Sequence, residues 1–339
     1  MKHFTLVCAA VLTVFAMAEA NAAGTVQPKT KVRPTKTVLL YPKGQNTDQG
    51  IVENGKAITL GPGESNGFTG YEKIDANGNM SIISDSARID IYLPKRPNGQ
   101  MVVCTPGGGY GFVSTFNEGA YVADWMLKQG ISVCVVKYRL PNGHWSIPLT
   151  DVQNAFRYCR AHAEEWGIKK IGIIGFSAGG HLAASASTLF VDDITRPDFS
   201  ILIYPVITME DGITHKGTHN NLIGKQSKWL DGTLPYNKYQ ENKAEYGRLM
   251  ARYSLELQIT DRTPVTFIAL SSNDDIVPPL NSIRYYMSLL KHNVSATMQI
   301  YPYGKHGWGF TTSEFGNDGL GNYRESFFNT LKTWLKEQE

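Results

Sequence analysis

The chain has 339 residues, of which 42% are hydrophobic, 19% charged and 11% aromatic, a composition that excludes disorder, collagen and coiled coil. Thirty-three Lys and Arg residues against 30 Asp and Glu residues give a net charge of +3. This charge is far below what a nucleic-acid-binding protein uses to neutralise phosphates, so we expect no nucleic-acid partner.

The first 22 residues have the pattern of a signal peptide. Lys2 and His3 precede an apolar run at 4–17. Ala20 and Ala22 are small residues at the two positions that a signal peptidase recognises. We therefore expect cleavage near Ala22 and a secreted or periplasmic protein. The apolar run is too short to cross a bilayer, so we expect no membrane anchor in the mature protein.

Residues 23–36 are rich in Pro, Lys and Thr, which predicts a flexible, solvated leader before a catalytic domain at 37–339. Removal of the signal peptide leaves an odd number of cysteines, Cys104, Cys134 and Cys159. Two of them lie in apolar runs, where a free thiol packs as a small hydrophobic group. We therefore do not expect disulfides to hold the fold.

Strand-like and helical segments alternate along the remaining chain. A strand with one buried face is expected at 88–93, because its apolar residues alternate. Short runs rich in Val and Ile predict strands buried on both faces at 101–104, 131–136, 171–174, 201–204, 265–270 and 296–300. Helices are expected at 118–129, 148–166, 181–191, 279–292 and 323–336. This order predicts an α/β fold, in which helices cover both faces of a mostly parallel, twisted sheet.

One segment does not follow this alternation. Residues 208–262 separate two predicted strands with a polar sequence much longer than a simple crossover needs. We interpret this segment as an insertion that caps the site.

Residues 175–179 have the form G-x-S-x-G around Ser177. The string follows the predicted strand at 171–174 and precedes a predicted helix, which is the context of a nucleophilic serine on a tight turn. Such a turn presents the Ser177 hydroxyl above the carboxyl edge of the sheet. The alternative is a glycine-rich turn whose serine only caps the helix.

A nucleophilic serine needs an imidazole to accept its proton and a carboxylate to orient that imidazole. His306 lies in a glycine-containing loop after the last predicted strand, and we predict it to be the base. Asp274 and Asp275 follow the strand at 265–270 and precede a helix. We favour Asp274 as the acid and Asp275 as a residue that complements the helix dipole, but both assignments stay open.

Three consecutive glycines follow the strand at 101–104 and allow the backbone to approach a substrate closely. We assign the amides of Gly108, Gly109 and Ala178 to an oxyanion hole, which stabilises the negative charge of a tetrahedral intermediate. A phosphate-binding loop is excluded, because the Lys and the Ser or Thr of that motif are missing.

Aromatic residues in the predicted loops give candidates for substrate binding. We expect Tyr110 and Trp308 to stack on sugar faces, with ordinary packing as the alternative for each. No cluster of His and carboxylate residues has a ligand spacing, so we predict neither a metal nor a cofactor.

Together these strings resemble the α/β-hydrolase superfamily and, within it, bacterial carbohydrate esterases of the acetylxylan and feruloyl esterase type. The resemblance rests on PGGGYGF at 106–112, VVKYRLP at 135–141, IGFSAGGHLAA at 174–184, THKGTHNNLIGK at 214–225, NDDIVPPLNS at 273–282 and YPYGKHGWG at 301–309.

The resemblance implies an exported serine esterase that removes acyl groups, above all acetyl, from plant polysaccharide or oligosaccharide fragments through an acyl-enzyme. Two alternatives remain at this point. One is a feruloyl or general short-chain carboxylesterase, and the other is an inactive homologue that only binds glycans. The sequence predicts no oligomeric state.

Overall fold

The computed structural model describes residues 27–41, 72–81, 83, 87–311 and 319–339, and the backbone of four short strands between residues 52 and 69. The predicted signal peptide at 1–22 lies outside the described residues. In the described part of the predicted leader, Thr30 is buried and donates a hydrogen bond of 2.8 Å to Asp124 Oδ1. This part is docked on the domain, which corrects the expectation of a solvated leader there.

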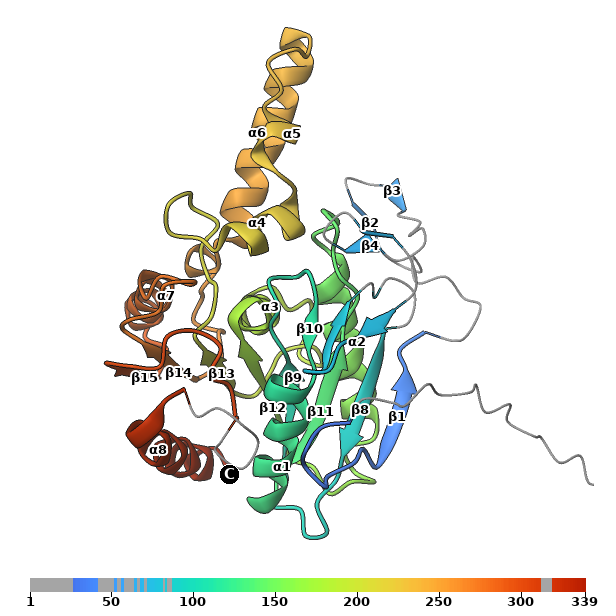
Figure 1. The fold of residues 1–339 in the computed structure, drawn as a ribbon, viewed down its shortest axis with the longest axis vertical. Coiled ribbons are helices and arrows are strands. Elements are labelled where there is room, and N and C mark those ends of the chain that lie inside the picture. Colours follow the sequence, from blue (N-terminus) through green and yellow to red (C-terminus); the bar gives the residue numbers. More distant parts are fainter. Residues whose placement is uncertain are drawn as a thin grey trace, which may run out of the picture.

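An eight-stranded sheet forms the centre of the protein (Figure 1). Its order is β1-β8-β11-β9-β12-β13-β14-β15, and the six strands from β11 to β15 in this order are parallel. The strands are β1 (Lys36–Leu39), β8 (Arg88–Tyr92), β9 (Gln100–Thr105), β11 (Ser132–Lys137), β12 (Lys170–Phe176), β13 (Ser200–Ile203), β14 (Thr266–Ser271) and β15 (Ala296–Tyr301). Every residue of β9, β13 and β14 is buried, as the continuous apolar runs predict.

The sequence did not predict the edge strand β1. It has only four residues, three of which are exposed, so it is too short to show an alternating pattern. The strand pairs antiparallel with β8, which in turn pairs antiparallel with β11.

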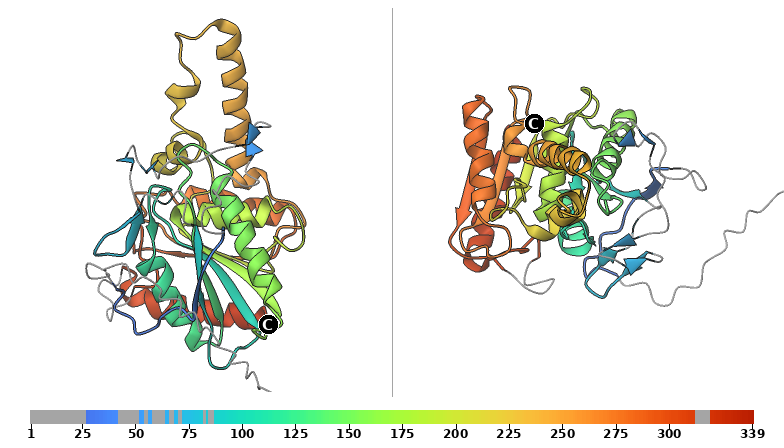
Figure 2. Two further views of the ribbon diagram at one scale, coloured as in Figure 1. Left: turned by 90° about the vertical axis from the view of Figure 1, so that its right-hand side faces the viewer. Right: turned by 90° about the horizontal axis from the view of Figure 1, so that it is seen from above.

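Helices cover both faces of the sheet (Figure 2). On one face, α1 (Tyr121–Lys128) meets α8 (Arg324–Glu337) through the stacked rings of Trp125 and Phe328, whose centroids are 5.1 Å apart. The other face carries α2 (Ile147–Ala161), α3 (Ser177–Thr188) and α7 (Leu280–Lys291). The predicted α/β architecture is therefore confirmed.

Short elements complete the described structure. They are β2 (Val52–Glu53), β3 (Lys56–Ala57), β4 (Glu64–Ser65), β5 (Phe68–Thr69), β6 (Lys73–Ile74), β7 (Asn79–Ser81), β10 (Val113–Ser114), and the single turns η1 (Phe116–Ala120), η2 (Leu255–Leu257) and η3 (Gly321–Tyr323). Cys104, Cys134 and Cys159 are all buried free thiols. Within the described part of the chain, no helix combines the length and the apolar composition that a membrane span requires.

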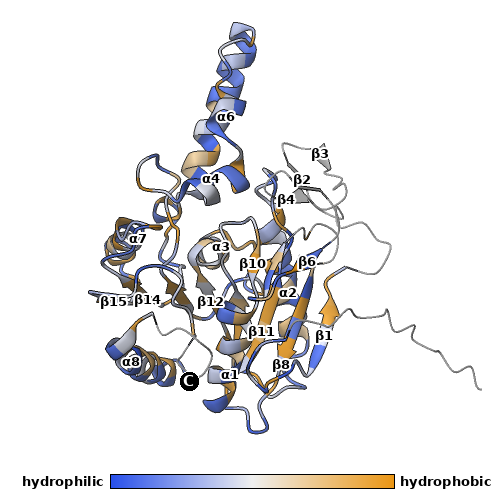
Figure 3. Ribbon diagram, in the orientation of Figure 1, coloured by the Kyte–Doolittle hydropathy of each residue, from blue (hydrophilic) through white to orange (hydrophobic). Residues whose placement is uncertain are grey.

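The insertion at 208–262 forms three helices, α4 (Lys216–Ile223), α5 (Gln226–Trp229) and α6 (Tyr236–Tyr253). The α5–α6 hairpin projects away from the sheet (Figure 1) and is mostly hydrophilic (Figure 3). Within α6, only Tyr246, Leu249 and Tyr253 are buried. The insertion is therefore divided, because α4 remains near the sheet whereas α5 and α6 form a projection rather than a closed cap.

Candidate active site

Ser177 lies where β12 passes directly into α3. The helix begins at Ser177 itself, four residues before the predicted start, and Ser177 has a φ of 53°. A Cβ on Gly179 would lie 2.1 Å from the Thr105 carbonyl oxygen, and a Cβ on Gly175 would lie 2.2 Å from the Gly179 carbonyl oxygen. Because only glycine fits at these two positions, they allow the tight turn that raises the serine above the sheet.

His306 bridges the predicted nucleophile and the predicted acid. Ser177 Oγ lies 2.8 Å from His306 Nε2, and His306 Nδ1 lies 2.7 Å from Asp274 Oδ2. The His306 side chain is 15% exposed and that of Asp274 only 1%. Ser177 at the start of α3, and Asp274 and His306 in the loops after β14 and β15, therefore meet at the carboxyl edge of the sheet.

Of the two neighbouring aspartates, Asp274 is the one that contacts His306. Its other oxygen, Oδ1, accepts hydrogen bonds from the amides of Ile276 at 3.0 Å and Val277 at 2.9 Å. Three donors therefore hold this carboxylate in one orientation. Asp275 is exposed.

The glycine loop after β9 presents free amides beside Ser177. Gly108 and Gly109 have φ angles of 130° and 61°, and their amides donate to no other group in the part of the chain that the structure describes. The amide of Ala178 lies in the first turn of α3, where N–H groups have no partner within the helix. The Gly107 amide is occupied, because it donates to Glu118 Oε2 at 2.6 Å.

Glu118 and Tyr204 are site residues that the sequence analysis missed. The Tyr204 hydroxyl donates to Glu118 Oε1 at 2.7 Å and accepts from the amide of Gly309 at 2.7 Å. Through Gly107 and Gly309, this buried network joins the glycine loop to the loop that carries His306. Burial raises the pKa of the Glu118 carboxyl, although the bonds from Tyr204 and Gly107 oppose this effect.

Comparisons with known proteins show the family of this chain. Residues 89–289, more than half of the chain, match the BD-FAE family. The chain belongs to the BD-FAE family. It is 37% identical over 254 residues to an acetylxylan esterase of Xylanibacter ruminicola, which covers 74% of this chain and 48% of that protein. It is also 31% identical over 226 residues to an endo-1,4-beta-xylanase B of Butyrivibrio fibrisolvens, over 62% of this chain and 32% of that protein. The chain thus spans about half, or less, of the length of these curated relatives.

Solved structures place this BD-FAE chain in the α/β-hydrolase fold. An acetyl ester-xyloside bifunctional hydrolase from Caldicellulosiruptor lactoaceticus has a TM-score of 0.63 and 24% identity, over 91% of this chain and 97% of that one. A carboxylesterase from Lactobacillus plantarum has a TM-score of 0.59 and 20% identity, over 79% and 97%.

The BD-FAE chain does not present Tyr110 as a stacking surface, which corrects the expectation from the sequence. Tyr110 is 1% exposed, and its hydroxyl lies 3.0 Å from His181 Nδ1. His181 Nε2 lies 2.9 Å from the Tyr253 carbonyl oxygen. The ring of Tyr110 therefore anchors the glycine loop to α3 and to the end of α6. Burial lowers the pKa of His181 to about 4.

Trp308 is corrected in the same way. It is 3% exposed and its Nε1–H donates to Ser271 Oγ at 3.1 Å. Its ring packs between Tyr204 and Phe327, at centroid distances of 4.9 Å and 5.0 Å. Through these contacts, Trp308 anchors the loop that carries His306 to the core.

Two cavities differ in their relation to the triad. A cavity of about 670 Å³ borders His306 and is also lined by Asn117 and Lys305. A second cavity of about 470 Å³ is lined by none of the triad residues.

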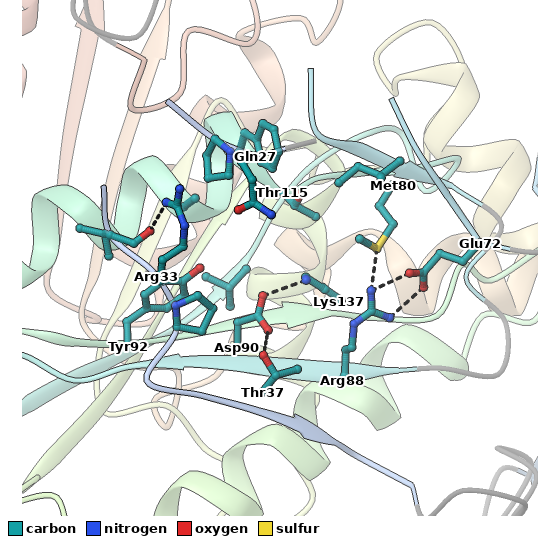
Figure 4. A pocket seen from close by; sticks show the side chains of 17 residues that line it. Gln27, Arg33, Thr37, Glu72, Met80, Arg88, Asp90, Tyr92, Thr115 and Lys137 are labelled. Carbon is teal, nitrogen blue, oxygen red and sulfur yellow. Dashed lines mark hydrogen bonds and ion pairs between the residues drawn. The ribbon is translucent and has the colours of Figure 1, made fainter. Parts of the chain in front are cut away.

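Four charged side chains of the second cavity face one another in two pairs (Figure 4). Lys137 Nζ lies 2.8 Å from Asp90 Oδ2, and Arg88 Nη2 lies 2.6 Å from Glu72 Oε1. The Arg88–Glu72 pair joins β8 to the residue that precedes β6, whereas Lys137 and Asp90 pair across the neighbouring strands β11 and β8. Among the described residues, no three His, Cys, Asp or Glu side chains form a metal-binding group.

Proposed function

We propose that this protein is an exported serine esterase that removes acyl groups, above all acetyl, from plant polysaccharide or oligosaccharide fragments. The observation that carries the proposal is the continuous set of hydrogen bonds from Asp274 through His306 to Ser177. Membership in the BD-FAE family and the similarity to an acetylxylan esterase support the substrate class. The apolar run at 4–17 supports export.

In the first half of the reaction, Ser177 Oγ attacks the ester carbonyl carbon while His306 Nε2 takes its proton. The imidazolium that forms is stabilised by the carboxylate of Asp274, which accepts from Nδ1. The negative charge on the former carbonyl oxygen lies against the amides of Gly108, Gly109 and Ala178. Collapse of this intermediate breaks the ester C–O bond, and the imidazolium protonates the departing sugar oxygen.

In the second half, water replaces the sugar at the same position. His306 removes a proton from the water, whose oxygen attacks the acyl-enzyme carbonyl. Collapse of the second tetrahedral intermediate returns the proton to Ser177 Oγ and releases the carboxylic acid. No step requires a group from outside the chain other than the substrate and water.

Replacement of the nucleophile tests this proposal. We expect Ser177→Ala to lower kcat for p-nitrophenyl acetate by about 10⁴-fold or more, because the covalent route is removed. The melting temperature should stay close to that of the wild type. Equal hydrolysis by the variant and the wild type would exclude Ser177 as the nucleophile.

The acyl group is tested by product analysis. We expect the wild type to release acetate from acetylated xylooligosaccharides faster than it releases ferulate from feruloylated ones. Release of ferulate alone would replace the acetyl assignment with a feruloyl esterase. Binding of the oligosaccharides without any hydrolysis would identify the inactive, glycan-binding alternative.

A further inference from the structure

His215 is a histidine of the insertion that the proposed reaction does not use. It precedes α4, and its side chain caps this helix by accepting a hydrogen bond from the Thr218 amide at 3.2 Å. Its Nδ1 also lies 2.9 Å from Thr218 Oγ1. The Nδ1 atom of His215 is therefore fully engaged by Thr218.

The protonation of the ring follows from these contacts. A ring nitrogen that accepts from an amide carries no proton, so a neutral His215 has its proton on Nε2. Burial and the charge of His306 lower the pKa of His215, while Asp274 opposes this shift, so the ring is neutral at neutral pH. Nε2–H has no hydrogen-bond partner among the residues that the structure describes.

This unpaired donor lies beside the glycine loop. The Cε1 atom of His215, which is bonded to Nε2, lies 3.3 Å from the position that a Cβ on Gly109 would take. The side chain of Asn221, on the same helix, donates to the Gly109 carbonyl oxygen at 2.9 Å. Helix α4 is thus seated on the loop whose amides face the substrate, and His215 lies at that contact.

We propose that His215 Nε2–H donates a hydrogen bond to a hydroxyl or ring oxygen of the sugar that carries the ester, and so determines the preference for sugar esters. The inference rests on the proposed function. In the proposed reaction, the carbonyl oxygen of the ester accepts hydrogen bonds from the amides of Gly108, Gly109 and Ala178. The substrate oxygens that remain within reach of a donor on the insertion side of this loop are those of the sugar.

His215→Asn separates this role from helix capping. Asparagine is a good N-cap and keeps a side-chain acceptor for the Thr218 amide, but it is too short to place a donor where Nε2 lies. One neutral hydrogen bond corresponds to a change of about 3-fold to 10-fold. We expect kcat/KM for acetylated xylooligosaccharide to fall by this factor relative to kcat/KM for p-nitrophenyl acetate, mainly through KM.

A matched control is His292→Asn. His292 ends α7, where its Nδ1 contacts the Ser288 carbonyl oxygen at 2.9 Å. We expect this variant to keep the wild-type ratio between the two substrates. An equal loss on both substrates in His215→Asn would overturn the proposal in favour of a role in charge stabilisation or folding. An unchanged ratio and unchanged KM would overturn it as well.

A binding measurement separates this inference from the proposed function. Unacetylated xylooligosaccharide is titrated into Ser177→Ala and into the double variant that also carries His215→Asn. We expect Kd to rise by about 3-fold to 10-fold in the double variant, whether or not the wild type hydrolyses any ester. Equal Kd values would contradict the sugar contact even in an active esterase.

Discussion

The carboxyl edge of the sheet and the α5–α6 hairpin are opposite in construction. At the sheet edge, Ser177 and Asp274 are buried and fixed by backbone amides or glycine turns. The hairpin is polar and buries three side chains along the 18 residues of α6. The contrast indicates that the proposed triad is held in a rigid frame, whereas we expect the projecting part of the insertion to tolerate change. Substitutions in the two regions should therefore differ widely in their effect on kcat and on the free energy of unfolding.

After the loss of the nucleophile, the largest effect is expected from the acid of the triad. Asp274→Asn should lower kcat by about 10³-fold to 10⁴-fold, because the amide no longer holds His306 in the tautomer that accepts the serine proton. Asp275→Asn is the matched control, since Asp275 is exposed, and it should stay within about twofold of the wild type. Steady-state kinetics with p-nitrophenyl acetate measure both. A larger loss in Asp275→Asn would reverse the assignment of the acid.

His181 should make the frame sensitive to acid. Its pKa falls from 6.5 to about 4 on folding, so the unfolded chain binds the proton more tightly. The contribution of His181 to the free energy of unfolding should therefore be at its maximum above pH 6.5. It should fall by about 3 kcal/mol as the pH drops to 4.

Urea titrations at several pH values test this sign. His181→Gln should lose most of the decline between pH 6.5 and 4, whereas His292→Gln, on α7, should retain it. An identical pH dependence in His181→Gln and the wild type would assign the acid sensitivity to other groups.

The network beneath the loops should have an intermediate effect. Tyr204→Phe leaves a buried oxygen of Glu118 and the amide of Gly309 without a partner, which should lower the free energy of unfolding by about 1–3 kcal/mol. We also expect kcat to fall by about tenfold, because the loop that carries His306 loses a support.

Tyr285→Phe provides the control for this substitution. The Tyr285 hydroxyl is buried and has no partner among the described residues, so its removal should leave stability equal or higher. Chemical denaturation and steady-state kinetics compare the two variants. Equal stability of Tyr204→Phe and the wild type would mean that the network contributes nothing.

The smallest effect is expected in the hairpin. Tyr236, at the start of α6, is 79% exposed, so Tyr236→Ala should change the free energy of unfolding by less than about 0.5 kcal/mol. Leu249→Ala, in the buried part of the same helix, should cost about 2–5 kcal/mol. Similar losses in both variants would contradict the contrast between the exposed start and the buried end of α6.

The sequence predicted which side chains would meet, because each candidate follows a strand at the same edge of a parallel sheet. Local order placed Ser177 and His306 but did not separate Asp274 from Asp275. Six apolar runs and one alternating segment located seven of the eight central strands. The sequence could not reveal Glu118, because its partner Tyr204 lies 86 positions away and meets it only through the tertiary fold.

Tyr110 was misjudged for a related reason. An aromatic residue in a glycine loop has the composition of a binding residue, but the direction of its side chain depends on backbone angles that composition does not encode. With a φ of 58°, Tyr110 turns inward toward His181. Likewise, the polar sequence at 208–262 revealed an insertion but not its division into a seated helix and a projection.

The burial of Cys104, Cys134 and Cys159 affects how readily their thiols react with oxidants. Burial raises the pKa of Cys104 and Cys134 well above the usual value, so almost none of the reactive thiolate forms. Cys159 is equally inaccessible, at 0% exposure. As long as the domain stays folded, these three thiols should therefore react slowly with thiol-directed reagents.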